Sequence, residues 1–321
     1  MSVSAQPQVS IVTPSLNQAR FLREALESVQ LQDYAAIEHI VVDGGSVDGS
    51  VEILEDMGDR IRWVSEPDAG QAHAVNKGFG MARGEILGWL NADDVYFPGA
   101  LTRVVDFFRR KPNASFVYGD VEAIDINGSS YGLRANVGPG GSKELVEHGD
   151  FIVQPGAFWL SDLWNEAGPL DERLHYTLDY EFWMRTAKRF HLHYLPDPLA
   201  KERLHGDAKT FSGDLERIEE LRAIAIRHGG TELATAFRGE AGAVWVRQGF
   251  RHLLSWRLRD GVRDIASGLK LSNSLLKTGL FLASWALLGD NVRARLWMNR
   301  AKAARRRRAR REERLLSPSK P

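Results

Sequence analysis

Two patterns of apolar residues alternate along the first 125 residues of the chain. Short apolar runs rich in Val and Ile predict strands at 9–13, 38–42, 60–65, 85–90 and 116–125. Between these runs, apolar residues recur at every third or fourth position, which predicts helices at 18–30, 50–57, 71–81 and 101–109. Strands and helices that alternate in this way indicate an α/β fold, a Rossmann-like, mostly parallel sheet flanked by helices.

The pattern changes at 138–142, where glycine is frequent and we expect a flexible loop. Beyond it the sequence predicts extended segments at 151–160 and 191–195, and helices at 180–190, 214–228, 231–258 and 261–288. We therefore predict a main domain over 1–213, with halves at 8–125 and 138–213, a helical module over 214–290 and a basic tail over 291–321.

Polar or acidic side chains follow each of the first four predicted strands. They are Ser15 and Asn17, then Asp43, then Glu66 and Asp68, and finally Asn91, Asp93 and Asp94. In an open parallel sheet, ligands bind beyond the carboxyl ends of the strands, where loop amides and helix N-termini converge. The sequence therefore predicts a binding site at this edge of the sheet.

The adjacent carboxylates of Asp93 and Asp94 are the most specific of these features. Two such groups repel each other unless a cation or hydrogen-bond donors hold them. Mg²⁺ or Mn²⁺, bound by one or two carboxylates and by the phosphate oxygens of a ligand, suits this arrangement. The alternative is a turn that caps the next helix.

Asp43 also has two interpretations. It precedes two glycines and Ser46, a composition typical of a turn before a helix. The functional alternative is a carboxylate that accepts a hydrogen bond from a nucleotide base, while the glycines let the backbone approach the ligand. The glycines of 78–80 do not form a dinucleotide fingerprint, because the third glycine is misplaced and no acidic residue follows at the required distance.

Charge and composition exclude other classes of protein. The chain has no cysteine, which excludes disulfides, thiolate metal sites and cysteine nucleophiles. Basic and acidic residues both total 42, but 12 basic and two acidic residues lie in 291–321, so the first 290 residues carry a net charge of −10. Because of this negative charge, the first 290 residues are not expected to bind nucleic acid, whereas the basic tail could contact phosphate groups or anionic lipid.

The expected location is the cytoplasm, with peripheral contact at the inner face of the membrane as a further hypothesis. Residues 1–8 lack the basic start and apolar run of a signal peptide. The apolar stretch within 271–288 is interrupted and is shorter than the roughly 20 residues needed to span a bilayer. It is either a packed core helix or an interfacial one.

Several segments together resemble the family 2 glycosyltransferases over roughly residues 8–210. Residues 9–18 are similar to the family's opening strand and loop, 40–50 to its second signature, and 66–71 and 84–94 to its third signature and its metal-binding Asp-x-Asp-type motif. The resemblance implies a nucleotide-diphospho-sugar transferase fold, a nucleotide-sugar donor and inversion at the anomeric carbon. The main domain is then the catalytic domain, with 8–125 as its nucleotide-sugar half and 138–213 as its acceptor half.

The resemblance also implies roles for individual residues on the donor side. Pro14 and Asn17 would line the nucleotide pocket and Asp43 would hold the base. Asp68 would lie nearby, Asp93 would bind the ribose or sugar, and Asp94 would bind the metal on the diphosphate.

An inverting transfer needs a carboxylate that takes the proton from the acceptor hydroxyl. Asp179 lies in a segment that resembles the family's helix start with the catalytic Asp, although the acidic residue often found just before it is Leu178 here. The alternative for Asp179 is a helix N-cap, and Glu181 is a competing base.

Three further residues resemble the acceptor and metal positions of the family. Gln154 could hydrogen-bond a sugar hydroxyl, and Trp159 could stack on a sugar ring or pack as a buried strand residue. His205 could reach the metal or the diphosphate, or be an ordinary loop residue.

We therefore predict a metal-dependent inverting glycosyltransferase that acts on a glycan or lipid-linked acceptor, in cell-envelope or surface-polysaccharide synthesis. One alternative is a sugar nucleotidyltransferase, for which the segment 14–18 lacks a basic, glycine-rich phosphate loop. Another is a catalytically silent protein that binds sugar nucleotides.

Overall fold

The computed structural model describes residues 3–134, 140–206, 208–209, 214–238, 241, 248 and 257–271. The chain divides into two compact units. Among the described residues, the first unit runs to Leu145 and resumes from Asp150 to Arg203, and the second contains Val146–Gly149 and the chain from Leu204 onwards.

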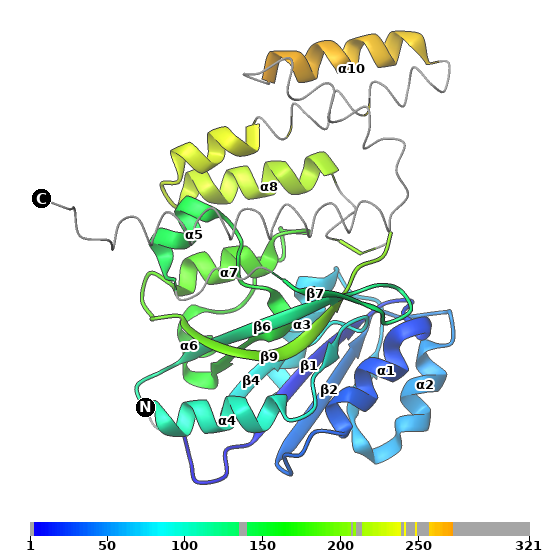
Figure 1. Ribbon diagram of the computed structural model, residues 1–321. Coiled ribbons are helices and arrows are strands. Elements are labelled where there is room, and N and C mark those ends of the chain that lie inside the picture. Colours follow the sequence, from blue (N-terminus) through cyan, green and yellow to red (C-terminus); the bar gives the residue numbers. More distant parts are fainter. Residues whose placement is uncertain are drawn as a thin grey trace, which may run out of the picture. The chain divides into compact units, whose positions relative to one another are not determined.

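The first unit is built on one nine-stranded sheet (Figure 1). Its parallel part has the order β3 (Arg62–Ser65), β2 (Ile37–Asp43), β1 (Val9–Ser15) and β4 (Ile86–Trp89). The sheet continues through β8 (Ala157–Leu160), β6 (Phe116–Ile124), β9 (His193–Arg203) and β5 (Val95–Tyr96), while β7 (Ser130–Leu133) pairs with β6. Strands β6 and β9 are parallel, whereas β8 is antiparallel to both its neighbours. The predicted α/β fold is confirmed.

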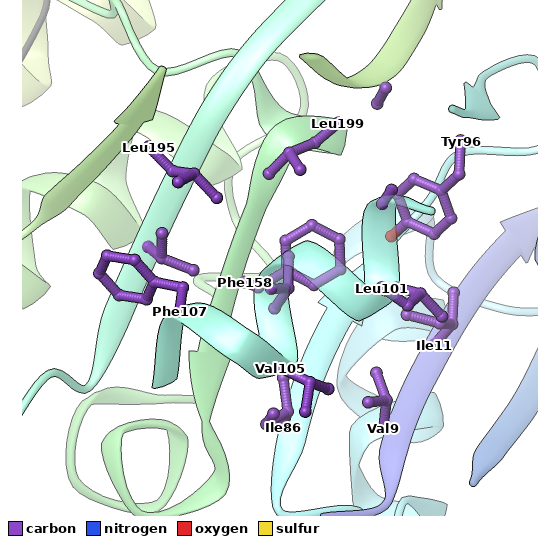
Figure 2. Close-up of a cluster of buried hydrophobic side chains, with 14 of the residues drawn as sticks. Val9, Ile11, Ile86, Tyr96, Leu101, Val105, Phe107, Phe158, Leu195 and Leu199 are labelled. Carbon is purple, nitrogen blue, oxygen red and sulfur yellow. The ribbon is translucent and has the colours of Figure 1, made fainter. Parts of the chain in front are cut away.

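Successive strand residues point to opposite sides of the sheet, so apolar side chains lie on both faces. Helices cover both faces and bury these side chains. Val9 and Ile11 of β1 pack with α4 (Ala100–Arg110) in one apolar cluster (Figure 2). Helices α1 (Ala19–Gln30) and α2 (Ser50–Met57) pack on β2 on this same side, around Val41.

Helix α3 (Gln71–Met81) covers the opposite face, where Val12 points. A Cβ atom at Gly78 would lie 2.4 Å from Val12 Cγ1, so glycine at this position lets the helix approach the strand closely. Gly78, one of the glycines that do not form a dinucleotide fingerprint, therefore has a packing role.

An aromatic cluster fills the α3 face beside β8. It joins Trp159 with Phe79, with Trp164 of α6 (Ser161–Ala167), and with Phe182 and Trp183 of α7 (Leu178–Thr186). Trp159 is 1% exposed. This favours the packed-strand alternative for Trp159 over stacking on an acceptor sugar.

Several element boundaries differ from the sequence-based expectation. β1 continues through Pro14, which pairs with Val42, and ends at Ser15. β9 is much longer than the predicted 191–195, because it continues past Pro196 and Pro198 with register shifts against β6. The sequence pattern missed β5, β7, α5 (Ser142–His148) and α6.

The second unit contains α8 (Asp214–Arg227), a helix at 231–238 and α10 (Leu258–Leu271). Ile224, Ala234 and Phe237 of this unit are buried side chains. No helix in the part of the chain that the structure describes has the length and apolar character needed to cross a membrane. Most of the helix predicted at 261–288 and the whole tail at 291–321 lie outside the described residues.

Candidate active site

The loops that follow β1, β2, β3 and β4 leave the sheet at one edge, as predicted. The strands are parallel, and their register pairs Ser15 with Asp43 and Asp43 with Ser65 at their carboxyl ends. β4 runs parallel to β1 on its other side. The polar residues after each strand therefore belong to one surface region of the first unit.

Asp43 organises the loop after β2. Its side chain is completely buried, and Oδ2 accepts hydrogen bonds from Gly45 N (3.1 Å), Ser46 N (2.8 Å) and Ser65 Oγ (2.7 Å). Oδ1 accepts a further hydrogen bond from Ser46 Oγ. These four bonds take up most of the accepting capacity of a carboxylate. The geometry thus agrees with the turn interpretation of Asp43, in which it shapes the backbone that a ligand meets.

Asn17 joins the loop after β1 to this turn. It is an exposed residue with a φ of +52°, a left-handed conformation that asparagine tolerates better than most residues. Its side-chain Oδ1 accepts a hydrogen bond from Val47 N (2.9 Å), and its backbone N–H donates to Ser46 Oγ (2.7 Å). Pro14, in contrast, is buried within β1.

The loop after β3 packs closely on the same turn. A Cβ atom at Gly44 would lie 3.0 Å from Asp68 Oδ2, and one at Gly45 would lie 3.4 Å from Pro67 N. Asp68 Oδ1 also accepts a hydrogen bond from Gly70 N (2.8 Å), just before α3 begins. The two glycines therefore permit the contact between these loops, and Asp68 lies beside the Asp43 turn.

Asn91 is the centre of the hydrogen-bond network after β4. Its Oδ1 accepts from Gln71 Nε2 and Trp89 Nε1, both at 2.8 Å, and its Nδ2 donates to Asp94 Oδ2 (3.2 Å) and Gln154 Oε1 (3.0 Å). Gln154 is 6% exposed, and its amide nitrogen donates to the carbonyl of Trp89. The structure therefore gives Gln154 a bracing role under the Asp93-Asp94 loop, where the resemblance suggested an acceptor contact.

The two carboxylates of this loop differ in their surroundings. Asp93 is half-exposed, whereas Asp94 is 2% exposed and accepts from Arg203 N at 3.0 Å through Oδ1. Burial, followed by the negative charges of Asp93 and Glu202, raises the pKa of Asp94 well above its usual range, although Arg203 N and Asn91 donate to it. A bound cation would favour the charged form. A pair of adjacent carboxylates, of which Asp94 is buried and costly to ionise, fits a hard divalent cation that takes its other ligands from phosphate oxygens.

Arg203 is a buried residue beside this loop to which the sequence assigned no role. Its guanidinium donates from Nε to Asp93 O (3.0 Å) and forms an ion pair with Glu24 (2.6 Å). Its Nη1 donates to the backbone carbonyls of Asp125 (3.2 Å) and Ile126 (3.4 Å). The predicted extended segment ended at residue 195, and nothing in the sequence around 203 indicated that this arginine turns back to the loop after β4.

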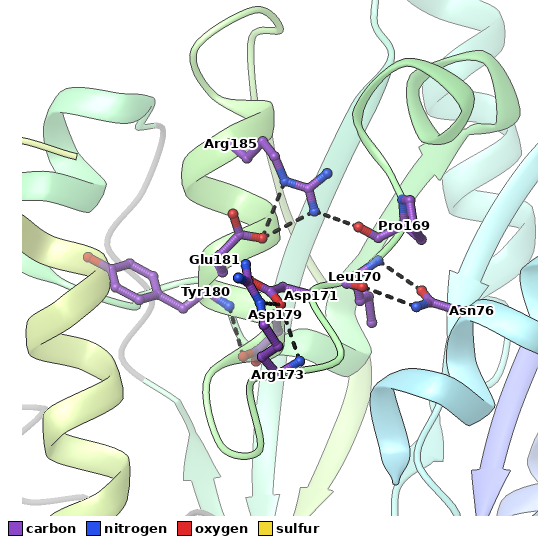
Figure 3. A network of polar contacts seen from close by, with 9 residues as sticks. All are labelled: Asn76, Pro169, Leu170, Asp171, Arg173, Asp179, Tyr180, Glu181 and Arg185. Carbon is purple, nitrogen blue, oxygen red and sulfur yellow. Dashed lines mark hydrogen bonds and ion pairs between the residues drawn. The ribbon is translucent and has the colours of Figure 1, made fainter. Parts of the chain in front are cut away.

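Asp179 lies in the first turn of α7 (Figure 3). The N-cap of this helix is Thr177, so the N-cap alternative for Asp179 is wrong. Asp179 is half-exposed, and its Oδ1 accepts from Tyr180 N at 2.8 Å. Glu181 is 5% exposed and forms an ion pair with Arg185 (3.1 Å), which also donates to Pro169 O.

Helix α3 connects the loop after β4 with the segment that leads into α7. Gln71, its first residue, donates to Asn91, as described above. Asn76, further along the same helix, holds both backbone polar groups of Leu170: its Nδ2 donates to Leu170 O (3.1 Å), and its Oδ1 accepts from Leu170 N (2.8 Å) (Figure 3). One helix thus contacts both the Asp93-Asp94 loop, through Asn91, and the chain at Leu170, in the segment that precedes α7.

His205 is 7% exposed and belongs to the second unit, where its carbonyl accepts from Ala208 N at 3.1 Å. Within the described ranges of the chain, no group of three or more His, Asp or Glu side chains is arranged to hold a metal ion. The Asp93-Asp94 pair remains the part of the site whose chemistry fits a cation.

Comparison with known proteins gives the family and the fold. The sequence profile of "Glycosyl transferase family 2" matches residues 10–163. An uncharacterized glycosyltransferase of Rickettsia typhi is 32% identical over 231 residues, which cover 68% of this chain and 70% of the relative.

Two solved structures are similar at low sequence identity. Residues 1–349 of TarS from S. aureus, in complex with UDP-GlcNAc, align with a TM-score of 0.58 and 15% identity over 82% of this chain and 81% of that one. The mannosyltransferase PcManGT from Pyrobaculum calidifontis, in complex with GDP-Man and Mn²⁺, aligns with a TM-score of 0.55 and 18% identity over 95% of this chain and 87% of that one. These likenesses show the fold, and the family profile together with the Rickettsia relative shows the family. The chain belongs to glycosyl transferase family 2 and is a glycosyltransferase.

Proposed function

We propose that this glycosyltransferase transfers a sugar from a nucleoside-diphosphate donor to a hydroxyl of a glycan or lipid-linked acceptor, with inversion at the anomeric carbon. The observation that supports this proposal best is the attachment of both halves of the site to α3. Gln71 holds the Asp93-Asp94 loop through Asn91, and Asn76 holds the segment that leads to Asp179. A carboxylate pair for the donor and a carboxylate for the acceptor are thereby braced by one rigid element.

On the donor side, we assign the nucleotide to the surface formed by the loops after β1, β2 and β3. Asn17 and Asp68 are the side chains of those loops that we assign to the nucleotide, while Asp43 keeps the loop backbone in shape. Asp93 binds the ribose or the sugar, and Asp94 holds Mn²⁺ or Mg²⁺. When bound, the metal offsets the negative charge that develops on the leaving diphosphate.

On the acceptor side, Asp179 acts as the general base. The acceptor oxygen attacks the anomeric carbon, the bond from that carbon to the diphosphate oxygen breaks, and the hydroxyl proton passes to the Asp179 carboxylate. Asp179 lies in the first turn of α7, where the helix N-terminus interacts favourably with a negative charge. Glu181 suits the role less well, because it is buried and paired with Arg185.

Two substitutions separate these roles. Asp94→Ala is expected to remove the increase in nucleotide affinity that Mn²⁺ provides. Asp179→Asn is expected to keep Mn²⁺-dependent nucleotide binding and to lower the transfer rate by about 10²- to 10⁴-fold. Asp162→Asn is the matched control, since Asp162 is an exposed carboxylate at the same position of α6 and lies outside the proposed site.

The experiment first screens UDP- and GDP-sugars by thermal shift, with and without Mn²⁺, because a ligand that binds the folded state raises its stability. The sugar that binds is then offered to a panel of glycoside acceptors, and NMR of the product gives its anomeric configuration. Retention of configuration, or full transfer by Asp179→Asn, would contradict the mechanism. Release of pyrophosphate from a nucleoside triphosphate and a sugar phosphate would instead indicate a nucleotidyltransferase, and binding without any turnover a silent protein.

The expected place of action is the cytoplasmic face of the cell envelope, with the basic tail, residues 291–321, in contact with anionic lipid. Flotation on liposomes that contain phosphatidylglycerol compares the full chain with a chain that ends at residue 290. Stronger flotation of the full chain at low salt would support the membrane contact, and equal flotation would contradict it.

A further inference from the structure

Arg203 places a buried positive charge under the loop that carries Asp93 and Asp94. The residue is 3% exposed, and a buried guanidinium is stable only when charge partners and acceptors surround it. Arg203 has both: Glu24 supplies the negative charge at 2.6 Å, and three backbone carbonyls accept its other N–H groups. Its position is therefore fixed from several sides.

The contacts of Arg203 with the loop are of a particular kind. The guanidinium binds the backbone carbonyl of Asp93 (Nε to O, 3.0 Å), and the backbone amide of Arg203 binds Asp94 Oδ1 (3.0 Å). The guanidinium therefore donates its hydrogen bonds to main-chain oxygen atoms, and Glu24 on α1 balances its charge. The described contacts of Arg203 thus fix the loop through its backbone and through Asp94 Oδ1, and the ion pair of the guanidinium is with Glu24.

From this arrangement we infer that Arg203 is the positioning residue of the metal-binding carboxylates, and that Glu24 keeps its guanidinium directed away from them. The inference rests on the proposed role of Asp94 as a metal ligand. Lysine cannot replace arginine here, because one ammonium group cannot reach the Asp93 carbonyl, the carbonyls of 125 and 126 and Glu24 from a single point. When Glu24 loses its charge, the guanidinium is drawn toward the nearest carboxylates and competes with the cation.

The test measures the affinity of the full chain for UDP and for GDP by calorimetry, each with and without Mn²⁺. Arg203→Lys is expected to weaken the Mn²⁺-dependent affinity by about 10- to 100-fold, which is typical for residues that orient metal ligands, and to leave metal-free nucleotide affinity unchanged. Glu24→Gln is expected to cause a smaller loss of the same kind. The effect of the double variant should be less than the sum, because both substitutions act through one contact.

Controls separate positioning from folding. Arg62→Lys alters another arginine–glutamate pair, with Glu38, at the other end of β2, and should leave both affinities unchanged. Thermal unfolding identifies variants that do not fold, and Glu24→Gln provides the decisive variant in that case because the Glu24 side chain is 57% exposed. A folded Arg203→Lys variant with the wild-type gain in affinity from Mn²⁺ would overturn the inference. A wild-type chain whose nucleotide affinity does not respond to Mn²⁺ would instead overturn the proposed metal role of Asp94, and this inference with it.

Discussion

A buried histidine in β2 makes the stability of the first unit depend on pH. His39 is 3% exposed, and burial lowers its pKa from 6.5 to about 3. Its Nδ1 lies 3.4 Å from Gln30 Nε2 and its Nε2 lies 3.0 Å from Thr13 Oγ1. An amide nitrogen only donates, so Nδ1 accepts and Nε2 carries the hydrogen that Thr13 accepts. A second proton on the ring would face Gln30 Nε2, and neither neighbour is charged to offset it.

The sign and size of the effect follow from the two pKa values. The folded state keeps His39 neutral, whereas the unfolded chain takes up a proton as the pH falls below 6.5, so stability is lost as the pH falls from 6.5 toward 3. Each pH unit within this window costs about 1.4 kcal/mol. Between pH 7 and pH 5, His39 alone is therefore expected to lower the free energy of unfolding by about 2 kcal/mol.

Urea unfolding at pH 7 and pH 5, followed by Trp fluorescence, measures this loss in the wild type and in His39→Gln. The other titrating groups contribute equally to both proteins, so the difference between the two losses isolates His39. The wild type should lose about 2 kcal/mol more than the variant. Equal losses in the two proteins would refute the argument that burial keeps His39 neutral.

Two further predictions concern packing and the Asn91 network. Asn91→Ala leaves Trp89 Nε1 and Gln154 Oε1 without their present partner in buried surroundings, at a cost of about 1–3 kcal/mol each in the free energy of unfolding; a urea-unfolding loss below about 1 kcal/mol would contradict this. Gly78→Ala places a methyl group against Val12 and is expected to destabilise the protein by about 1–3 kcal/mol. Gly80→Ala, on the same helix with no atom within 4 Å of the added Cβ, is the control and should be neutral or slightly stabilising; equal effects of the two would argue against close packing at Gly78.

The first half of the fold was predictable because its signals are local. Apolar runs and helical spacing identified β1 to β4 and α1 to α4 to within a few residues, and the parallel order then placed the polar strand ends at one edge. The sequence does not reveal β5, a strand of two residues that depends on pairing with β9. β9 itself was shortened in the prediction, since the prolines at 196 and 198 are local signals against a strand that its pairing with β6 overrides.

The site residues divide in the same way. The Asp93-Asp94 pair and Asp179 were identified from their positions in motifs, and their assigned roles stay predictions. The bracing residues depend on long-range contacts: Arg203 reaches the loop after β4 from a point 110 residues along the chain. Gln154 was expected to meet the acceptor, and its contacts with Asn91 and Trp89 depend on β8 pairing next to β4, which no local pattern encodes.

The clamp between Asn76 and Leu170 has an evolutionary consequence. Asn76 contacts Leu170 through main-chain atoms, as one donor and one acceptor, and also donates from Nδ2 to Glu172 Oε1 (2.9 Å). Any residue other than proline can present the same two groups. Residue 170, which is 3% exposed, can therefore change to another side chain that fits its buried surroundings while this junction between α3 and the segment before α7 is preserved.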